Sequence, residues 1–416
     1  MKIFITSIGT RGDIEPFLAV AELLKKRGHE VVYCFPVQFK NLLPEYAKFH
    51  PLSAEFLELI NSKEGSTVMG KADIFKKAKA LFTLYKKGKR VSKIIANEHI
   101  EALKIENPDV IIQHPKCAVP FLWNLKFKTR IITYSPVPFV LYPVKDHPHI
   151  GWPYLNNPVY IKLSYKVSTY AWVKQIYDVQ SKLKMPFKYS KSEISASLFK
   201  NKIIYAVSPQ LFERPENWPK HVEVGGHHEP DKSNDFKPAK SLLQFIETHD
   251  KILFLTFGSM VNYAPQKTSQ CFYEVIDTLG MPCIVNTSSG GLVQLSEYAR
   301  RNNFYFVQDI PYDWLFKHVH AVIHHGGSGT THMGLKHGLP TLIIPHIIDQ
   351  FMWNRLIYQK QLGPKGISIN KINSQKLKPL IESLFNKNHY SKNTKIIASK
   401  MAQEKKDKPL VECIEN

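Results

Sequence analysis

The stretch that decides the fold runs from residue 322 to residue 331 and reads Val322-Ile323-His324-His325-Gly326-Gly327-Ser328-Gly329-Thr330-Thr331. A short apolar run, typical of a buried strand, passes into a glycine-rich turn and then into a helix-length segment. A helix that begins at such a turn presents backbone N–H groups and the positive end of its dipole to an anion. We therefore predict a phosphate cradle formed by Gly327, Ser328, Gly329 and Thr330.

A second strand and two polar side chains follow the cradle. Residues 338–345 read Gly-Leu-Pro-Thr-Leu-Ile-Ile-Pro, and Asp349 and Gln350 come shortly after them. Ligands of open parallel sheets bind at the carboxyl ends of the strands, so we expect Asp349 and Gln350 to lie beside the cradle. Hydroxyl-binding side chains next to a diphosphate site indicate a nucleotide-sugar.

The block from His324 to Gln350 resembles the donor-binding signature of the family 1 glycosyltransferases. Residues 310–316, Ile-Pro-Tyr-Asp-Trp-Leu-Phe, look like the branch that glucosylates sterols and glycopeptide antibiotics. The resemblance covers the whole chain and includes residues 9–17, Gly-Thr-Arg-Gly-Asp-Ile-Glu-Pro-Phe, and residues 257–260, Phe-Gly-Ser-Met. Three ordered motifs at family-like spacing are a strong signal, whereas any single one is weak.

The pattern of apolar runs predicts the fold class. Apolar β-branched runs alternate with amphipathic segments in both halves of the chain, which is typical of doubly wound α/β units. The expected strands are 3–8, 30–35, 110–113, 130–134 and 203–207 in the first half, then 252–257, 283–286, 304–307, 321–323 and 341–344 in the second. The first crossover helix is expected over 16–27.

A chain of 416 residues fits two domains. The resemblance implies the GT-B fold, in which two Rossmann-like domains face each other across a cleft. The expected organisation is an N-terminal acceptor-binding domain over 1–225, a linker over 226–240, a C-terminal nucleotide-sugar-binding domain over 241–400, and a last helix in 401–416 that crosses back to the first domain.

The positive charge is concentrated in the first half. Residues 1–225 hold 34 Lys and Arg against 19 Asp and Glu, the larger part of the total net charge of +21. Much of the excess lies in the segment Lys71 to Lys104, where Ile74, Ala78 and Leu81 recur at helical spacing among lysines. Such a helix suits peripheral contact with an anionic membrane; a solvated basic face over an ordinary core is the alternative. No nucleic-acid-binding module accompanies the charge, so we expect no nucleic acid partner.

Cysteine and histidine spacing argue against metal and disulfide chemistry. The five cysteines are scattered and lack CxxC spacing, which favours a reducing, cytoplasmic location. Peripheral association with the inner face of the membrane is the alternative location. The pairs His147 and His149, and His227 and His228, lack ligand spacing, so we expect no metal and no cofactor. The start of the chain is a short strand rather than a signal peptide, and no apolar run reaches the roughly 18 residues of a membrane span.

The chemistry of inverting transfer requires a base for the acceptor hydroxyl and stabilisation of the departing diphosphate. Asp13, expected in the loop before the first helix, is the candidate base, because the resemblance implies Asp here in the sterol and antibiotic branch and His in many other relatives. The alternative is that Asp13 only caps the helix. Arg11 is expected to pair with Asp13, to reach a phosphate, or to lie on the surface.

For the donor diphosphate and hexose, the resemblance implies a role for each of several residues. His324 is expected to hydrogen-bond the diphosphate, and Ser259 to face the same site. His325 is expected either to contact the donor or to pack. Asp349 and Gln350 are expected to bind the hexose hydroxyls, with loop polarity as the alternative.

For the nucleoside, Ile310 falls where relatives read the base through main-chain groups. His332 stands in the place of a ribose-binding Glu, and Asp309 in the place of a stacking Trp. These departures leave both uridine and thymidine diphosphate sugars open as donors.

The expected acceptor is hydrophobic. Residues 135–180 break the strand–helix rhythm with prolines and aromatic side chains, and the resemblance places acceptor-binding loops here; core filling is the alternative. We therefore expect transfer of a hexose, glucose from UDP-glucose, to a hydroxyl of a sterol-like, carotenoid, glycolipid, polyketide or peptide acceptor. A nucleotide-sugar 2-epimerase of related fold and a non-catalytic sugar-nucleotide-binding partner subunit are the alternatives.

Overall fold

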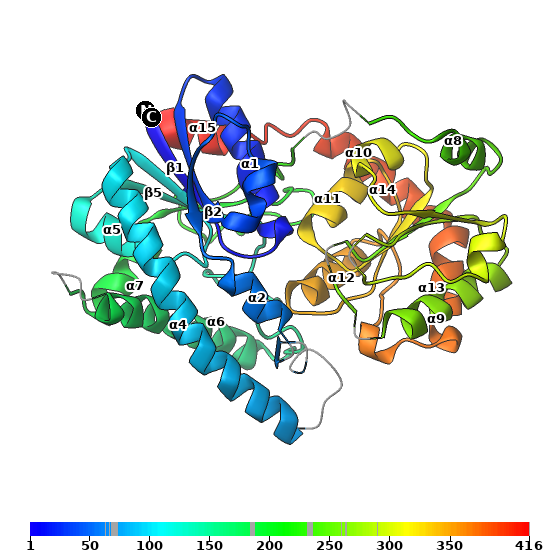
Figure 1. The fold of residues 1–416 in the computed structure, drawn as a ribbon, viewed down its shortest axis with the longest axis horizontal. Coiled ribbons are helices and arrows are strands. Elements are labelled where there is room, and N and C mark those ends of the chain that lie inside the picture. Colours follow the sequence, from blue (N-terminus) through cyan, green and yellow to red (C-terminus); the bar gives the residue numbers. More distant parts are fainter. Residues whose placement is uncertain are drawn as a thin grey trace. The chain divides into compact units, whose positions relative to one another are not determined.

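The computed structural model describes residues 1–62, 64–65, 67, 74–183, 188–230, 236–258, 260–262, 264–288 and 290–415. The chain divides into two compact units (Figure 1). The first comprises Met1–Pro230 and Lys405–Asn416, and the second comprises Asp231–Glu404. Each unit contains one parallel sheet between helices, which confirms the expected α/β class with two Rossmann-like units.

The first unit is built on a seven-stranded sheet of order β3-β2-β1-β4-β5-β6-β7, with every neighbouring pair parallel. Its strands are β1 (Lys2–Thr6), β2 (Glu30–Pro36), β3 (Lys48–Leu52), β4 (Val110–Gln113), β5 (Arg130–Ser135), β6 (Lys202–Tyr205) and β7 (Val222–Val224). Its helices are α1 (Arg11–Lys26), η1 (Val37–Leu42), α2 (Glu55–Asn61), α4 (Ile74–Glu106), α5 (Val119–Phe127), α6 (Pro158–Lys182), α7 (Lys191–Lys200) and α15 (Lys408–Glu415).

Alternation along these strands divides the core between the two faces of the sheet. In β4, Ile111 packs in the cluster formed with α4, α5, α6 and α7, whereas Val110 and Ile112 pack in the cluster formed with α1 and α15. Leu410 and Ile414 of α15 are buried in that second cluster, so α15 lies beside α1 and β1 (Figure 1).

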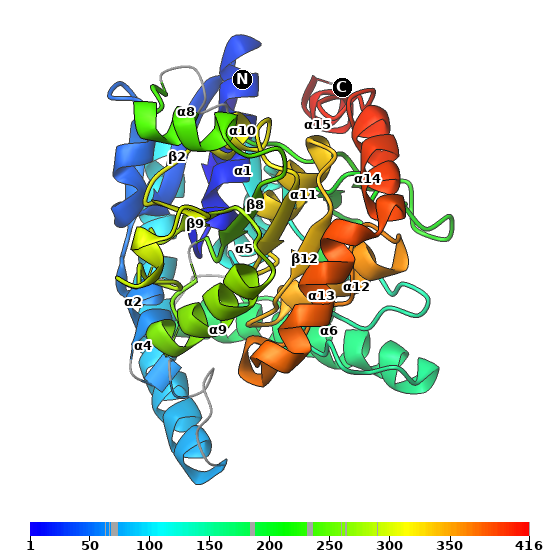
Figure 2. The same cartoon turned by 90° about the vertical axis from the view of Figure 1, so that its right-hand side faces the viewer.

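The second unit is built on a five-stranded parallel sheet of order β10-β9-β8-β11-β12. Its strands are β8 (Leu253–Thr256), β9 (Cys283–Asn286), β10 (Phe304–Val307), β11 (Ala321–His324) and β12 (Thr341–Ile343). Its helices are α8 (Lys240–Glu247), α9 (Pro265–Thr278), η2 (Tyr298–Arg300), α10 (Tyr312–Leu315), α11 (Ser328–Lys336), α12 (Asp349–Gln359), η3 (Ile369–Lys371), α13 (Ser374–Asn386) and α14 (Asn388–Met401). α9 and α13 pack together over one face of this sheet (Figure 2), and α8, α10 and α11 cover the other.

The expected strand boundaries differ from the observed ones by at most two residues, one helix start is wrong by five, and two strands were not predicted. The first helix begins at Arg11 and not at Pro16, because Thr10 and Asp13 form a capping box that starts it five residues earlier. β3 was missed because it is a short edge strand of mostly half-exposed residues that contains Pro51. β7 was missed because its three residues include Glu223 and only Val222 is buried, whereas the equally short β12 is wholly buried.

The segment expected to link the domains divides between described and undescribed residues. Residues 226–230 belong to the first unit, where the buried His228 hydrogen-bonds the Tyr134 hydroxyl at 2.7 Å and contacts Asp407 at 3.0 Å. Residues 231–235 lie outside the described residues. All five cysteines are free, and no helix in the described ranges combines the length and the apolar character needed to cross a membrane.

Candidate active site

The first sheet has a topological switch point between β1 and β4, its two central neighbours. The strand order runs outward from β1 to β3 on one side and from β4 to β7 on the other. Such points form crevices at the carboxyl edge of a sheet, where ligands bind. Asp13 follows β1 in the first turn of α1, and His114 and Lys116 follow β4.

These three side chains meet although about a hundred residues separate Asp13 from the other two. The Asp13 carboxylate accepts hydrogen bonds from Lys116 Nζ at 2.8 Å and from the Thr10 backbone N–H at 2.8 Å. His114 Nε2 lies 3.3 Å from Asp13 Oδ1. A side chain at Gly9, whose φ is +143°, would collide with this carboxylate, since its Cβ would lie 2.1 Å from Oδ2.

The surroundings keep Asp13 ionised. Burial by itself would raise the Asp13 pKa, but the charge of Lys116 and the contacts with His114 outweigh it and hold the pKa well below its usual value. Burial lowers the pKa of His114, so its imidazole is neutral. His114 Nδ1 accepts the Lys116 backbone N–H at 3.1 Å; the proton of the ring is therefore on Nε2, which faces Asp13.

The capping alternative for Asp13 is realised in this arrangement, and it does not exclude catalysis. One carboxylate oxygen, Oδ2, holds Thr10, while Oδ1 faces Lys116 and His114. Arg11 pairs with Glu15 at 2.5 Å, so the expectation that it could pair with Asp13 is wrong. Glu15 lies one helical turn after Arg11 and is within its reach.

The second sheet has its switch point between β8 and β11, and the glycine-rich turn follows β11 there. Gly327 is the N-cap of α11, no side chain caps the helix, and its first backbone bond runs from Thr331 N–H to the Gly327 carbonyl. The N–H groups of Gly329 and Thr330 precede that bond. The predicted cradle therefore has the backbone of an anion-binding helix start.

Glycine is required in the turn itself. Gly326 has φ of +97°, and a Cβ there would lie 2.6 Å from Ile343 Cγ2 and 3.2 Å from Gln350 Cβ. This close approach packs the turn against the end of β12 and the start of α12. The cradle and the Asp349–Gln350 pair are thereby brought side by side.

His324 ends β11 with no exposed surface. Its Nδ1 accepts the Gly326 N–H at 3.0 Å, so the ring proton is on Nε2. That atom is buried and has no hydrogen-bond partner among the residues that the structure describes. Burial lowers the pKa of His324 to about 3, so the imidazole is neutral at physiological pH.

Two further histidines lie near His324, of which His325 is buried and His346 is half-buried. His325 packs against Gly258 and Gly327, and His346, which the sequence did not single out, stacks edge-on against Phe257. Burial lowers the pKa of His346 to about 4 and that of His325 well below its usual value. Like His324, each has one buried ring nitrogen that finds no partner in the described part of the chain.

Gln350 and Asp349 begin α12. Gln350 is buried, and its Oε1 accepts the backbone N–H groups of His346 at 2.7 Å and Ile347 at 3.1 Å. It thus holds the loop between β12 and α12. The alternative that Gln350 is only a solvent-exposed polar residue of a loop is therefore excluded. Asp349 is half-buried at the first position of the helix.

The residues expected at the nucleoside lie at the same edge of the sheet or inside it. The Ile310 side chain is buried in the core, which leaves its main chain as the group to read a base. His332 is buried against Trp353 and donates from Nδ1 to the Ser328 carbonyl at 2.8 Å. Ser259 lies outside the described residues.

Tyr312, from the motif that follows Ile310, links the ends of two strands. Its hydroxyl lies 2.8 Å from the Thr256 hydroxyl and 3.3 Å from the Asn286 amide. This contact ties β8, β9 and α10 together beneath the candidate nucleoside site.

Sequence reasoning overlooked His114, Lys116 and His346. The signal that could have found His114 and Lys116 is their place directly after a predicted strand end, the same criterion that selected Asp13. His346 directly follows the apolar run that ends at Pro345. Across the described residues, no group of His, Cys, Asp and Glu side chains is arranged to hold a metal ion.

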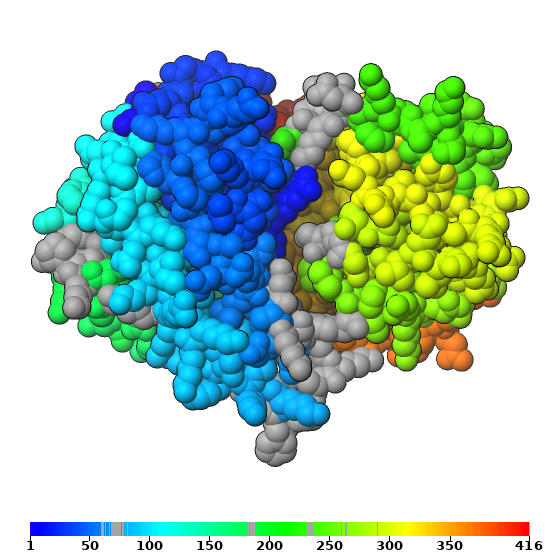
Figure 3. Space-filling view, in the orientation of Figure 1, coloured from blue at the N-terminus to red at the C-terminus, as the bar shows by residue number. Residues whose placement is uncertain are grey.

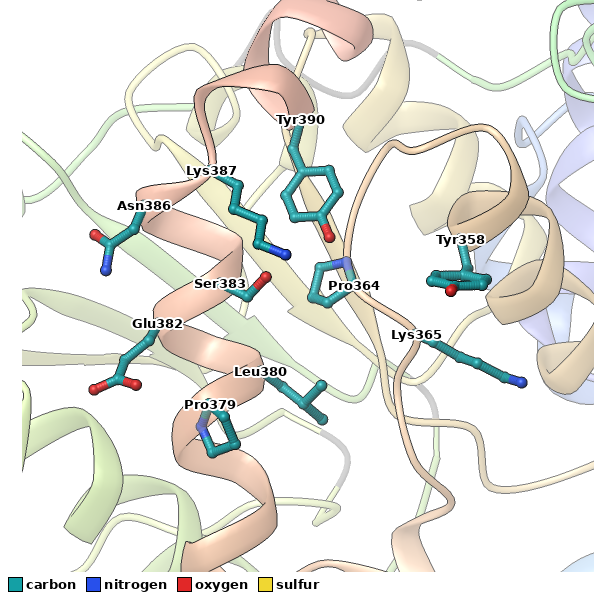
Figure 4. A pocket seen from close by; sticks show the side chains of 10 residues that line it. All are labelled: Tyr358, Pro364, Lys365, Pro379, Leu380, Glu382, Ser383, Asn386, Lys387 and Tyr390. Carbon is teal, nitrogen blue, oxygen red and sulfur yellow. The ribbon is translucent and has the colours of Figure 1, made fainter.

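A pocket of about 530 Å³ lies elsewhere on the second unit (Figure 4). Its lining comes from the end of α12, the loop after it, α13 and the start of α14. Tyr390 and Ser383 direct their hydroxyls toward Pro364, whereas Glu382 and Asn386 point away. Tyr358 lies near the opposite end of α12 from Asp349, about 14 Å away at the rise of an α-helix, so this pocket is separate from the cradle.

Comparison with known proteins assigns both ends of the chain. Residues 3–121 match the glycosyltransferase family 28 N-terminal domain. Residues 293–416 match the erythromycin biosynthesis protein CIII-like C-terminal domain.

Among curated proteins, the chain is similar to the sterol 3-beta-glucosyltransferase UGT80A2 of Arabidopsis thaliana. The two are 28% identical over 400 residues, which cover 92% of this chain and 60% of the relative. It is also 26% identical to a sterol 3-beta-glucosyltransferase of Kluyveromyces lactis, over 95% of this chain and 32% of that protein. The chain thus spans less than two thirds of the length of these relatives.

Among solved structures, the fold is similar to the glycosyltransferase of kitacinnamycin, with a TM-score of 0.71 at 15% identity over 100% of this chain and 98% of that one. It is also similar to the glycosyltransferase SsfS6 of Streptomyces sp. SF2575, complexed with thymidine diphosphate. The TM-score is 0.62 at 18% identity, over 100% of this chain and 99% of that one. Family matches, curated relatives and fold agree. The chain has the GT-B fold of these glycosyltransferases, and all three comparisons agree with the resemblance to the family 1 glycosyltransferases.

Proposed function

We propose that this protein transfers a hexose from a nucleoside-diphosphate sugar to a hydroxyl of a hydrophobic, lipid-like acceptor, with inversion at the anomeric carbon. The observation that carries the proposal is the buried Nε2–H of His324, which lies near the start of α11 and has no partner among the described residues; none of their side chains caps that helix. An unsatisfied buried donor is costly unless a ligand satisfies it. An anion at this cradle would do so.

The proposed donor site stabilises the leaving diphosphate with neutral groups. Backbone N–H groups of Gly329 and Thr330, the dipole of α11 and the Nε2–H of His324 all favour negative charge. This set stabilises an oxyanion without a metal, which is why we propose metal-independent transfer. The thymidine diphosphate bound to the similar SsfS6 supports the diphosphate, and the names of the sterol relatives support glucose as the sugar.

The hexose contacts are assigned to Asp349 and Gln350. Because Gln350 Oε1 already accepts two backbone N–H groups, the sugar contact proposed for it uses the Nε2 amide. Asp349 would accept hydrogen bonds from hexose hydroxyls. The nucleoside contacts are assigned to the main chain of Ile310 and to His332. UDP-sugars are the first donors to test, and thymidine diphosphate sugars are the second.

Asp13 is the proposed base. The acceptor hydroxyl gives its proton to the Asp13 carboxylate while its oxygen bonds to the anomeric carbon, and the bond from that carbon to the diphosphate oxygen breaks with its electron pair leaving on the diphosphate. This single displacement inverts the anomeric centre. Lys116 and His114 do not enter the bond changes; we assign them to holding the carboxylate ionised and oriented.

A screen of acceptors tests the proposal. The purified chain is incubated with UDP-glucose, UDP-galactose or TDP-glucose and with sterols, carotenoids, glycolipids or polyketides, and products are analysed by mass spectrometry. We expect an acceptor product heavier by one hexose, with the β-configuration if UDP-α-glucose is the donor. Conversion of the donor alone to its 2-epimer would favour the epimerase alternative, and donor binding without hydrolysis or transfer would favour a non-catalytic subunit.

A further inference from the structure

The solvent-facing side of α6 is apolar. Val159, Leu163, Val167 and Tyr170 are between 44% and 70% exposed. Their spacing of four, four and three residues places them in one stripe along the helix, roughly 16 Å long at the rise of an α-helix. Lys162 and Lys166 flank the stripe on the same side of the helix.

The opposite side of α6 is apolar as well. Tyr165, Val173 and Ile176 are buried, and the last two pack in the cluster that covers the first sheet. α6 thus carries apolar side chains on two sides, with polar residues such as Lys162 and Lys166 between them. The core accounts for one side of α6 and leaves the other to be explained.

α4 extends the apolar stripe with aromatic and basic side chains. Phe82 and Tyr85 are more than half exposed. Lys86 Nζ lies 4.6 Å from the centre of the Phe82 ring, and Lys89 Nζ lies 4.4 Å from that of Tyr85. α4 thus presents aromatic rings beneath lysine ammonium groups.

The two helices contact each other, and both lie at the lower end of the first unit (Figures 1 and 2). Lys174 of α6 interacts electrostatically with both Tyr85 and Tyr170, so the aromatic residues of the two helices share one surface. We call Val159, Leu163, Val167, Tyr170, Phe82 and Tyr85 the α4–α6 surface. Figure 3 shows α4 at the surface of the first unit.

The charge around this surface is mainly positive, although Asp178 pairs with Lys174 at 2.7 Å and Glu64 pairs with Lys87 at 2.8 Å. Residues 74–97 contain eight Lys and Arg and no Asp or Glu, and residues 147–177 contain no Asp or Glu. Tyrosine rings suit the boundary between lipid tails and head groups, and lysines place their stems along apolar material with the ammonium group at phosphate depth. A second copy of the chain would bring two such basic rims together, which like-charge repulsion opposes.

We propose that the α4–α6 surface docks on a bilayer that contains anionic lipid, with the α6 stripe in the interfacial layer and the lysines of α4 at the head groups. The basic helix α4 is therefore only one of the two parts of the membrane-binding surface, and the apolar stripe of α6 is the other. Its apolar part resists salt and its basic part does not. It does not depend on glycosyl transfer, and its test uses no enzymatic readout.

The experiment is co-sedimentation of the full chain with vesicles of phosphatidylcholine, alone or with one third phosphatidylglycerol. Leu163→Ser with Val167→Ser removes apolar area from the exposed stripe, and Lys86→Gln with Lys89→Gln removes charge. The matched controls change exposed residues of the second unit: Tyr358→Ser with Ile396→Ser, and Lys376→Gln with Lys378→Gln. Thermal melts of all variants verify that each is folded.

Wild-type protein is expected to bind the anionic vesicles and to leave them as salt rises. The serine pair should lower partitioning by about tenfold or more, and the glutamine pair by about fivefold per lysine at low salt only. Both controls should bind like wild type. Equal binding of wild type to neutral and anionic vesicles, binding to neither, or wild-type binding by the serine pair would overturn the proposal. So would a dimer in analytical ultracentrifugation that the serine pair dissociates, because the stripe would then cover a second copy.

Discussion

Replacing Lys116 by methionine should move the acidic limb of the pH–rate profile. The ammonium group lies 2.8 Å from Asp13 Oδ1 and favours its ionised form. An opposite charge at this distance lowers a carboxyl pKa by about 1 to 3 units. The Lys116 side chain is 46% exposed, so solvent screens its charge and the lower half of that range applies. Removing the charge should raise the Asp13 pKa by about 1 to 2.

The sign follows from the role of Asp13 as a base. Only the carboxylate accepts a proton, so activity falls as the pH drops through the Asp13 pKa. With a higher pKa in Lys116→Met, kcat/KM should begin to fall about 1 to 2 pH units above the wild-type limb. Burial raises the Asp13 pKa in both proteins, so the difference between them reports the charge of Lys116.

The assay is initial-rate transfer with the acceptor identified in the screen, measured from pH 9 down to the lowest pH at which each protein stays folded in a thermal melt. Because the wild-type pKa lies well below the usual carboxyl value, we expect wild-type activity to persist to the acid end of this range and activity of Lys116→Met to be lost first. Lys116→Arg keeps the charge and should keep the limb near that of wild type. Lys104→Met, which removes an exposed partner of Glu101, should leave the profile unchanged. A limb in Lys116→Met that coincides with the wild-type limb would refute the assignment of the limb to Asp13, or the control of Asp13 by Lys116.

Three further outcomes are expected. Asp13→Asn should lower turnover by about 10²- to 10⁴-fold, the usual contribution of a positioned general base, with UDP affinity nearly unchanged by calorimetry. His324→Ala should weaken UDP binding by about 1.5–3 kcal/mol, the scale of a hydrogen bond to a charged group, whereas Asp349→Ala should change UDP affinity by less than about twofold and impair discrimination between glucose and galactose donors. Gly326→Ala should lower the melting temperature, because φ is +97° and its Cβ would lie 2.6 Å from Ile343.

Each of these outcomes has a result that contradicts it. Asp13→Asn with more than a tenth of wild-type turnover would remove Asp13 from the role of base. If His324→Ala and Asp349→Ala lowered the affinity for UDP equally, Asp349 would not act through the hexose. A Gly326→Ala variant that melts with the wild-type protein would show that the turn relaxes without cost.

The sequence by itself determined the local elements and their order. β4, β9 and β10 begin and end at the residues expected, because buried parallel strands are short apolar runs bounded by turns, and that signal is local. The glycine-rich turn and the helix that follows β11 are equally local, since the residues that free the backbone N–H groups lie within the helix start. The motifs at residues 9–17, 257–260 and 324–350, which carry the family resemblance, are local as well.

Tertiary structure decided what surrounds the reactive groups. The sequence placed Asp13 in a loop, yet the capping box with Thr10 draws it into α1. The pairing of β1 with β4 brings Lys116 and His114 to its carboxylate across about a hundred residues of chain. Burial at the switch point of the second sheet leaves the neutral His324 with an unpartnered donor. Charge state and orphaned donors depend on which strands are neighbours, a property of the whole sheet that no single stretch of sequence contains.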